Sequence, residues 1–273
     1  MPRTESWKEL YGGDGKDLVL AIDFPVTGRP EGTFSDMYAG MEPDYSIWET
    51  TVPEADGQVS AERYVTRWSA DARNAGRRIR GVLGYCAGSV FAAELARRIS
   101  EWQNEPPEVV LFDPEVPTGR TLYIQFHQAL ETMVGVLTPD EIADVRAEGQ
   151  SAHGGKDDLV AYGAALGKIF REAGHVAFQR IGLDADRGEE LVGTFLSFLT
   201  WLAVTTQIDP TAIWARSVAV TSATSTNGLN TVPPEARDGI VARELRFDVE
   251  HRDLLRTAEV GRAVTELLAR RGR

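Results

Sequence analysis

The chain has 273 residues, of which 42% are hydrophobic and 26% are charged, and its formal net charge at pH 7 is −12. This composition is sufficient to bury one large core or two modest ones, and it excludes a fibrous or disordered chain. Because the 29 basic residues are scattered among 41 acidic ones, the charge also argues against a nucleic-acid partner.

Strands and helices are predicted to alternate over the first part of the chain. After an irregular or short helical lead-in over residues 1–16, apolar runs predict strands over 17–24, 45–52, 80–83 and 109–112, and helical periods cover 61–76 and 90–99. This alternation is typical of a mostly parallel sheet, whose functional groups lie at the carboxyl ends of the strands. Asp23, Cys86 and Asp113 would then share one edge.

Between residues 118 and 208 the pattern changes to one helix after another. Helical periods cover residues 122–137, 139–148, 157–173 and 189–208. Long insertions usually shape a substrate chamber, so we predict a helical lid over 118–208 between core segments 1–117 and 209–273. A helical subdomain without a pocket is the alternative. The core then resumes with predicted strands over 216–222 and 241–249 and a terminal helix over 254–273.

Two features bear on the compartment. The single cysteine excludes an internal disulfide, and the first residues carry charge without the apolar run of a secretory signal, so we expect a cytoplasmic protein. Residues 191–208 lack charge over the length of a membrane span. Polar Thr194, Ser197 and Thr200 recur every three residues there, which favours an amphipathic helix, and we expect no membrane span.

The sequence Gly84-Tyr85-Cys86-Ala87-Gly88 lies between a predicted strand and a predicted helix. Gly-x-Cys-x-Gly at such a turn is the nucleophile-elbow pattern with sulfur in place of the usual hydroxyl, and its glycines prevent collisions around a strained turn. The amino terminus of the next helix would favour a thiolate at Cys86 and an oxyanion beside it. Since most lone cysteines are small buried hydrophobes, the pattern has to be judged by its partners.

A cysteine nucleophile needs a base, and the base needs a group that orients it. Three histidines, His127, His153 and His175, fall within the predicted helical stretch, where a surface or packing role is expected. His251 instead follows the last predicted strand. The chain order nucleophile, acid, histidine places the base there, so His251 is the predicted base.

Three carboxylates compete to orient His251. Asp113 ends the strand that follows the elbow helix. Asp248 is only three residues from His251, which makes facing its ring awkward. Asp209 precedes Pro210 and is typical of a turn or helix cap. Position and elimination therefore favour Asp113.

The predicted oxyanion donors are two backbone N–H groups. One belongs to Ala87, the residue after the nucleophile. The other would come from the loop after the first strand, Phe24-Pro25-Val26-Thr27-Gly28. Val26 is the candidate, because Pro25 has no N–H to donate.

This combination resembles the stand-alone and terminal thioesterase domains of nonribosomal peptide and polyketide assembly lines. The matching pieces are the loop 24–28, the elbow with Ala92-Ala93-Glu94-Leu95-Ala96-Arg97-Arg98 after it, Val110-Leu111-Phe112-Asp113, and His251. The resemblance covers nearly the whole chain. It implies the α/β-hydrolase fold, an α/β architecture with a mostly parallel central sheet and an inserted helical lid.

Two residues depart from this family's pattern. Most members have serine where this chain has Cys86, and most have glycine before the histidine where this chain has Glu250. Dienelactone hydrolases share the pattern Gly-x-Cys-x-Gly, but their acid lies one strand later than Asp113, which argues against that family.

Within the resemblance, the chain is similar to the cysteine-type Dieckmann cyclases, which release β-ketoacyl-aminoacyl chains as tetramic acids or pyridones. The resemblance implies that Cys86 accepts the chain from the phosphopantetheine arm of an acyl or peptidyl carrier protein, without a further cofactor or a metal. The aromatic and aliphatic composition of the predicted lid indicates an apolar small-molecule substrate. The alternatives are a hydrolytic or macrocyclising thioesterase and a non-catalytic carrier-binding protein.

Overall fold

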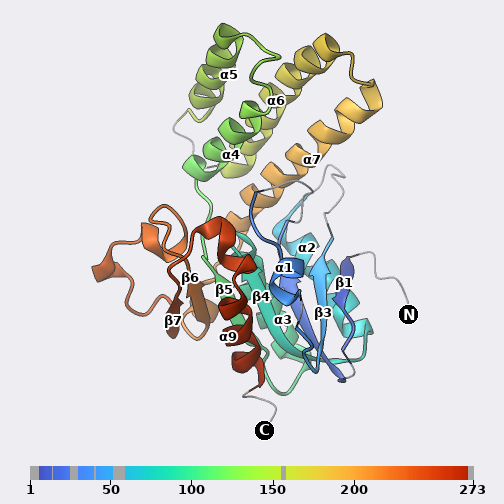
Figure 1. Cartoon of the computed structure of the whole chain (residues 1–273), viewed down its shortest axis with the longest axis vertical. Coiled ribbons are helices and arrows are strands. Elements are labelled where there is room, and N and C mark those ends of the chain that lie inside the picture. Colours follow the sequence, from blue (N-terminus) through green and yellow to red (C-terminus); the bar gives the residue numbers. More distant parts are fainter. Residues whose placement is uncertain are drawn as a thin grey trace. The chain divides into compact units, whose positions relative to one another are not determined.

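The computed structural model describes residues 6–13, 15–24, 30–39, 41–51, 59–154 and 158–269. These residues form two compact units (Figure 1). The sheet unit comprises the described residues of 1–52, 62–116 and 208–273. The helical unit comprises the described residues of 53–61 and 117–207.

The sheet unit is built on one sheet, in which seven described strands have the order β1-β3-β2-β4-β5-β6-β7. Their bounds are Trp7–Tyr11 (β1), Asp17–Ile22 (β2), Ser46–Thr50 (β3), Arg78–Tyr85 (β4), Glu108–Phe112 (β5), Val218–Thr221 (β6) and Arg243–Arg246 (β7). β1 runs antiparallel to β3, and the other neighbouring pairs are parallel. The predicted mostly parallel sheet is therefore confirmed.

The predicted irregular or short helical lead-in is wrong over Trp7–Tyr11, which form β1. Trp7 is buried, and its indole N–H donates a hydrogen bond to the carbonyl oxygen of Trp68 at 3.1 Å. The rings of these two residues also lie 6.3 Å apart between centroids. Pairing with β3 and this distant aromatic contact stabilise a strand that is too short for its own sequence to indicate.

The central strands are buried on both faces. Leu18, Val19 and Leu20 of β2 are fully buried. A continuous apolar run is expected of a parallel strand that is covered on both sides. β7 lies at the edge of the sheet, where Arg243 and Arg246 are exposed.

Helices cover both faces of this sheet. They are α1 (Phe34–Tyr38), α2 (Ala61–Asn74), α3 (Gly88–Trp102), α8 (Thr211–Trp214) and α9 (Ala258–Ala269), with shorter 3-10 turns η2 (Gly228–Thr231), η3 (Pro234–Ala236) and η4 (His251–Arg256). α1 and α9 cover one face, and α2 and α3 cover the other (Figure 1). The predicted terminal helix over 254–273 is interrupted, because the 3-10 turn η4 precedes α9.

The helical unit contains α4 (Gly119–Glu131), α5 (Pro139–Ala152), α6 (Leu159–Ile181), α7 (Ala185–Val204) and the 3-10 turn η1 (Thr205–Gln207). Side chains at the amino termini fix these boundaries, since Thr118 and Thr138 form capping boxes and Asp158 and Asp184 cap α6 and α7. Gly182, at φ 65°, ends α6 in the left-handed conformation that glycine tolerates.

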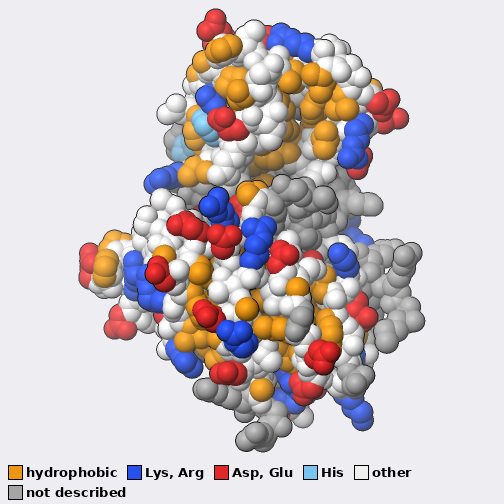
Figure 2. Space-filling model, in the orientation of Figure 1, with side chains coloured by type: hydrophobic (Ala, Val, Ile, Leu, Met, Phe, Trp, Pro, Cys, Tyr) orange, Lys and Arg blue, Asp and Glu red, His pale blue; other side chains and the backbone are white. Residues whose placement is uncertain are grey.

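Figure 2 shows hydrophobic side chains on the visible face of both units. Six of the seven described large hydrophobic residues that are exposed belong to the helical unit, namely Ile124, Val134, Val160, Val176, Ile181 and Leu191. The uncharged stretch 191–208 lies in α7 and the segment after it, where the hydroxyls of Thr194 and Thr200 donate to carbonyl oxygens of their own helix. Among the described residues, none of the helices combines the length and hydropathy that a membrane crossing requires.

Candidate active site

Cys86 lies at the sharp turn between β4 and α3. Its φ is 51°, and among the described residues only Cys86 and Asp113 are non-glycine residues with positive φ. Hydrogen bonds hold this conformation, because the N–H of Cys86 donates to the carbonyl oxygen of Phe112 at 2.8 Å and the N–H of Ser89 donates to the carbonyl oxygen of Cys86 at 3.1 Å. Strained backbone of this kind persists only where its surroundings determine it, and it clusters at functional sites.

The two glycines of the elbow are required by close backbone approach. A Cβ atom at Gly88 would lie 2.3 Å from the carbonyl oxygen of Ile22, and one at Gly84 would lie 2.6 Å from the Cα of Ser89. Both distances are far below van der Waals contact, and both involve backbone atoms. The motif therefore allows α3 to start directly against β2.

Asp113 follows β5 at the same edge of the sheet and is fully buried. Its φ is 41°. One carboxylate oxygen, Oδ1, accepts the N–H of Ser222 at 2.9 Å, and the other, Oδ2, lies 2.7 Å from Nδ1 of His251. Gly228 packs against it, since a Cβ there would lie 2.7 Å from the Cα of Asp113. The carboxylate is thus fixed with one oxygen directed at the imidazole.

His251 is held through both its backbone and its ring. Its backbone N–H donates to the hydroxyl oxygen of Thr224 at 2.8 Å, and that hydroxyl donates to Glu250 at 3.0 Å. With Nδ1 facing Asp113, the other ring nitrogen, Nε2, is left to accept a hydrogen bond. It lies 2.9 Å from the hydroxyl of Tyr85, whose ring stacks on the imidazole at 5.0 Å between centroids.

The sulfur of Cys86 faces a carboxylate. Its Sγ is 3.9 Å from Oε2 of Glu115, to which the thiol donates. Burial, and then the Glu115 carboxylate, raise the pKa of this thiol well above its ordinary value. Asp23 and Asp113 act in the same direction, whereas a hydrogen bond from the backbone N–H of Ala87 lowers the pKa. Burial and the negative neighbours therefore act against the thiolate that the amino terminus of α3 would favour.

The structure gathers most of the predicted site at the carboxyl edge of the sheet. Asp113 and His251 are in direct contact, and Cys86 and Ala87 form the adjoining elbow. Val26, the second predicted oxyanion donor, lies outside the described residues. Among the described residues, neither nitrogen of His251 bonds to the thiol: Nδ1 faces Asp113 and Nε2 faces Tyr85.

Sequence reasoning missed two residues of this site. Tyr85 occupies the variable position before the nucleophile, and Glu115 follows Asp113 by two residues. Position was the only available signal, since each lies within two residues of one that the sequence had singled out. Their contacts cross long distances in sequence, and the hydroxyl of Tyr85 reaches a histidine 166 positions away.

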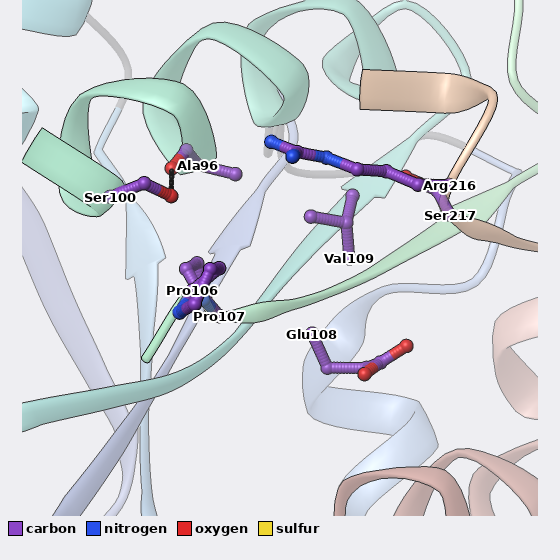
Figure 3. A pocket seen from close by; sticks show the side chains of 8 residues that line it. All are labelled: Ala96, Ser100, Pro106, Pro107, Glu108, Val109, Arg216 and Ser217. Atoms are coloured by element: carbon purple, nitrogen blue, oxygen red, sulfur yellow. Dashed lines mark hydrogen bonds between the residues drawn. The ribbon is translucent and has the colours of Figure 1, made fainter. Parts of the chain in front are cut away.

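A cavity lies at the opposite edge of the sheet, where β5 and β6 begin (Figure 3). Its lining includes Glu108, Arg216 and Ser217, and the hydroxyl of Ser100 above it donates to the carbonyl oxygen of Ala96 at 2.8 Å. Since functional groups of parallel sheets gather at the carboxyl ends of the strands, this cavity is separate from the Cys86 site.

Solved thioesterase domains share this fold. The NocB thioesterase domain, in covalent complex with a fluorophosphonate nocardicin G analogue, is 16% identical with a TM-score of 0.52, over 96% of this chain and 99% of that chain. The Vlm2 thioesterase domain bound with a dodecadepsipeptide is 16% identical with a TM-score of 0.55, over 98% of each chain. A four-domain nonribosomal peptide synthetase is 15% identical with a TM-score of 0.56, over 97% of this chain, which spans 20% of the synthetase.

An acetylester hydrolase from Corynebacterium glutamicum has a similar structure, with 12% identity and a TM-score of 0.51 over 97% of this chain and 88% of that chain. No protein-family model and no curated protein matches the sequence. At these identities the comparisons establish the fold, which is the α/β-hydrolase fold of thioesterase domains, with a mostly parallel sheet and flanking helices.

Proposed function

We propose that this protein releases an acyl chain from a carrier-bound thioester through a covalent intermediate on Cys86. The observation that carries the proposal is the 2.7 Å contact between Asp113 and His251 beside a cysteine with positive φ at a strand-to-helix turn. In this proposal Cys86 is the nucleophile, His251 is the general base, and Asp113 holds the imidazole in the tautomer that accepts a proton at Nε2.

Formation of the intermediate requires both His251 and the Cys86 thiol to change their hydrogen-bond partners, which are Tyr85 and Glu115 in the structure. Nε2 exchanges its hydrogen bond from the hydroxyl of Tyr85 for one from the Cys86 thiol. The thiol proton then passes to Nε2, a C–S bond forms to the acyl carbon, and the C–S bond to the carrier breaks. The proton moves from His251 to the departing carrier thiol. This acyl transfer replaces one thioester by another, so it has little intrinsic free-energy cost.

We further propose that the intermediate closes by carbon–carbon bond formation, as in a Dieckmann cyclase. His251 removes the acidic proton between the two carbonyl groups of a β-ketoacyl-aminoacyl chain. The carbanion attacks the acyl carbon, the N–H groups of Ala87 and Val26 hold the oxyanion, and the C–S bond to Cys86 breaks. The proton on His251 returns to the sulfur, and a tetramic acid or pyridone leaves. A sulfur ester supports this step because it is more reactive than the oxygen ester a serine would form.

A hydrolytic or macrocyclising thioesterase is the second candidate. It is favoured by the neighbours themselves, which are named as thioesterase domains. The same residues would act, with water, an amine or an alcohol replacing the carbanion. A non-catalytic carrier-binding protein would keep the fold without needing the paired Asp113 and His251.

The proposed partner is an acyl or peptidyl carrier protein that delivers the chain on its phosphopantetheine arm, and the proposed location is the cytoplasm. The basic residues near the start of β4 are engaged elsewhere. Arg77 donates to the carbonyl oxygens of Gly15 and Asp17, and Arg80 pairs with Asp17 and Asp44. These arginines therefore fix strand ends, and we do not assign them to carrier docking.

Mass spectrometry of the products tests the proposal. The purified protein is incubated with a β-ketoacyl-aminoacyl thioester mimic, beside the Cys86→Ala variant. A product one water lighter than the free acid, formed only by the wild type, supports cyclising release. Free acid as the sole enzyme-dependent product identifies a hydrolytic thioesterase, and equal behaviour of the two proteins contradicts a catalytic role for Cys86.

A further inference from the structure

Glu115 is joined to the elbow by both its side chain and its backbone. Oε2 accepts the hydrogen bond of the Cys86 thiol at 3.9 Å between oxygen and sulfur. The backbone N–H of Glu115 donates to the carbonyl oxygen of Cys86 at 3.4 Å. The side chain is half-buried, so its charge faces the sulfur with less intervening water than a fully exposed carboxylate would have.

The turn after β5 brings Glu115 to this place. Asp113 has φ 41°, which redirects the chain as soon as the strand ends. Pro114 follows, and its ring fixes φ near −65°. The chain therefore turns toward the elbow within two residues, and Asp113 and Glu115 face different partners although they are close in sequence.

The other polar groups near the sulfur have different roles. Asp113 uses its two oxygens for the N–H of Ser222 and for His251. The imidazole of His251 is bonded to Tyr85 at its remaining nitrogen. Glu115 is consequently the carboxylate that accepts the hydrogen bond of the thiol.

We propose that Glu115 is a further functional residue of this site, whose carboxylate holds the proton of Cys86 in the resting enzyme so that the nucleophile waits as a thiol until substrate is bound. The proposal rests on the role of Cys86 in the proposed function. A negative charge about 4 Å away disfavours a second negative charge on the sulfur. Because thiolates and not thiols react with electrophiles and oxidants, Glu115 protects the nucleophile between turnovers.

Charged and polar groups from several elements surround the thiol. Asp23 after β2 and Asp113 after β5 carry negative charge, and Ala87 at the start of α3 directs its N–H at the sulfur. His251 on η4 faces Tyr85 in this state. Asp23 and Asp113 act through their fields, and Glu115 differs from them because it bonds the sulfur directly.

The test measures the rate at which iodoacetamide alkylates Cys86 as a function of pH. The chain has one cysteine, so the rate reports this thiol without interference. In Glu115→Gln, which keeps the size and removes the charge, we expect the midpoint of the profile to fall by about one pH unit or more. Alkylation at neutral pH should accordingly become about tenfold faster.

A matched control removes the same charge far from the sulfur. Glu101 lies at the exposed carboxyl end of α3, about 20 Å along the helix from the elbow, where its charge is screened. We expect Glu101→Gln to alkylate with the wild-type profile. An unchanged midpoint in folded Glu115→Gln would overturn the proposal.

A second variant separates the charge from the new amide. Glu115→Ala removes the carboxylate without adding a donor, and it should lower the midpoint in the same direction. If circular dichroism shows that Glu115→Gln does not fold, Glu115→Ala replaces it in the test. A lowered midpoint in the Gln variant alone would contradict the proposal, because the amide N–H would then be the cause. Alkylation needs no acyl substrate, so this result is independent of whether the protein cyclises or hydrolyses a thioester.

Discussion

The two edges of the sheet use charged residues in opposite ways. At the amino edge, Arg80 pairs with Asp17 and Asp44, both at 2.7 Å, and its guanidinium also lies over the ring of Tyr45 at 5.1 Å from the centroid. Every charge in this group faces an opposite charge or a π face. Such contacts stabilise the strand ends, and they provide no group that is placed to transfer a proton.

At the carboxyl edge, groups of like charge gather instead. Asp23, Asp113 and Glu115 all oppose a negative charge on Cys86. Cys86 and Asp113 also have positive φ. The comparison indicates that one edge contributes stability, while the other holds strained backbone, which clusters at functional sites.

The largest expected effect is on the nucleophile. Cys86→Ala should reduce product release by roughly 10⁴-fold or more, since the covalent intermediate is lost. The free energy of unfolding should change by less than about 1 kcal/mol, because alanine replaces a small half-buried thiol. Product mass spectrometry and thermal unfolding measure the two quantities. Cys86→Ser should lose cyclisation more than hydrolysis, and cyclisation at the wild-type rate in that variant would contradict the role given to sulfur.

Asp113→Asn should lower kcat by about 10³- to 10⁴-fold, because the amide no longer holds the tautomer of His251 that accepts a proton at Nε2. Steady-state kinetics of thioester turnover provide the measurement. Asp209→Asn is the matched control, since Asp209 is an exposed turn residue that bonds Thr211. If the Asp209 variant lost as much activity as the Asp113 variant, the choice of acid would be wrong.

Gly88→Ala should destabilise the fold by about 1–3 kcal/mol, because the added Cβ would lie 2.3 Å from a backbone oxygen that has little freedom to move. Chemical denaturation measures the free energy of unfolding. Gly193→Ala in α7 is the control, since a Cβ there meets no atom within 4 Å and alanine favours a helix interior. Equal stability of the two variants would mean that the elbow does not need its second glycine.

Arg80→Met should lower stability by about 1–2 kcal/mol and leave turnover within about twofold of the wild type. Arg80 lowers the pKa of Asp44 by hydrogen bonding. A lowered folded-state pKa contributes stability above the unfolded value, which is near 4, and loses it as the pH falls through that range. Chemical denaturation at neutral pH and below pH 4 measures the free energy of unfolding of both proteins. The difference between the wild type and Arg80→Met should be smaller in acid. A large loss of turnover would contradict the conclusion that the amino edge contributes stability and not activity.

The smallest expected effect is an increase in the rate at which the acyl intermediate forms. Tyr85→Phe removes the hydroxyl that occupies Nε2 of His251 at 2.9 Å. Releasing a hydrogen bond of about 1 kcal/mol should speed formation of the acyl intermediate by up to about fivefold. Single-turnover kinetics with a thioester mimic would measure it. A large decrease would show that Tyr85 positions the imidazole for catalysis and does not restrain it.

Local patterns predicted much of the sheet unit correctly. The alternation of strands and helices led to the parallel sheet, because continuous apolar runs between helical periods are typical of strands buried on both faces. β1 was missed, since it depends on pairing with β3 and on the contact between Trp7 and Trp68. The catalytic roles of Cys86, Asp113 and His251 stay predictions, although Asp113 and His251 do meet.

The sequence by itself determined most of the core strands and helices and the order of the functional residues along the chain, because periodicity and glycine spacing are local properties. Only the tertiary structure decided which atoms face one another. The ring of His251 is directed at Asp113 and Tyr85, and the thiol of Cys86 is directed at Glu115. These contacts join residues between 29 and 166 positions apart. Their geometry follows from strand register and the turn after β5, which no local pattern encodes.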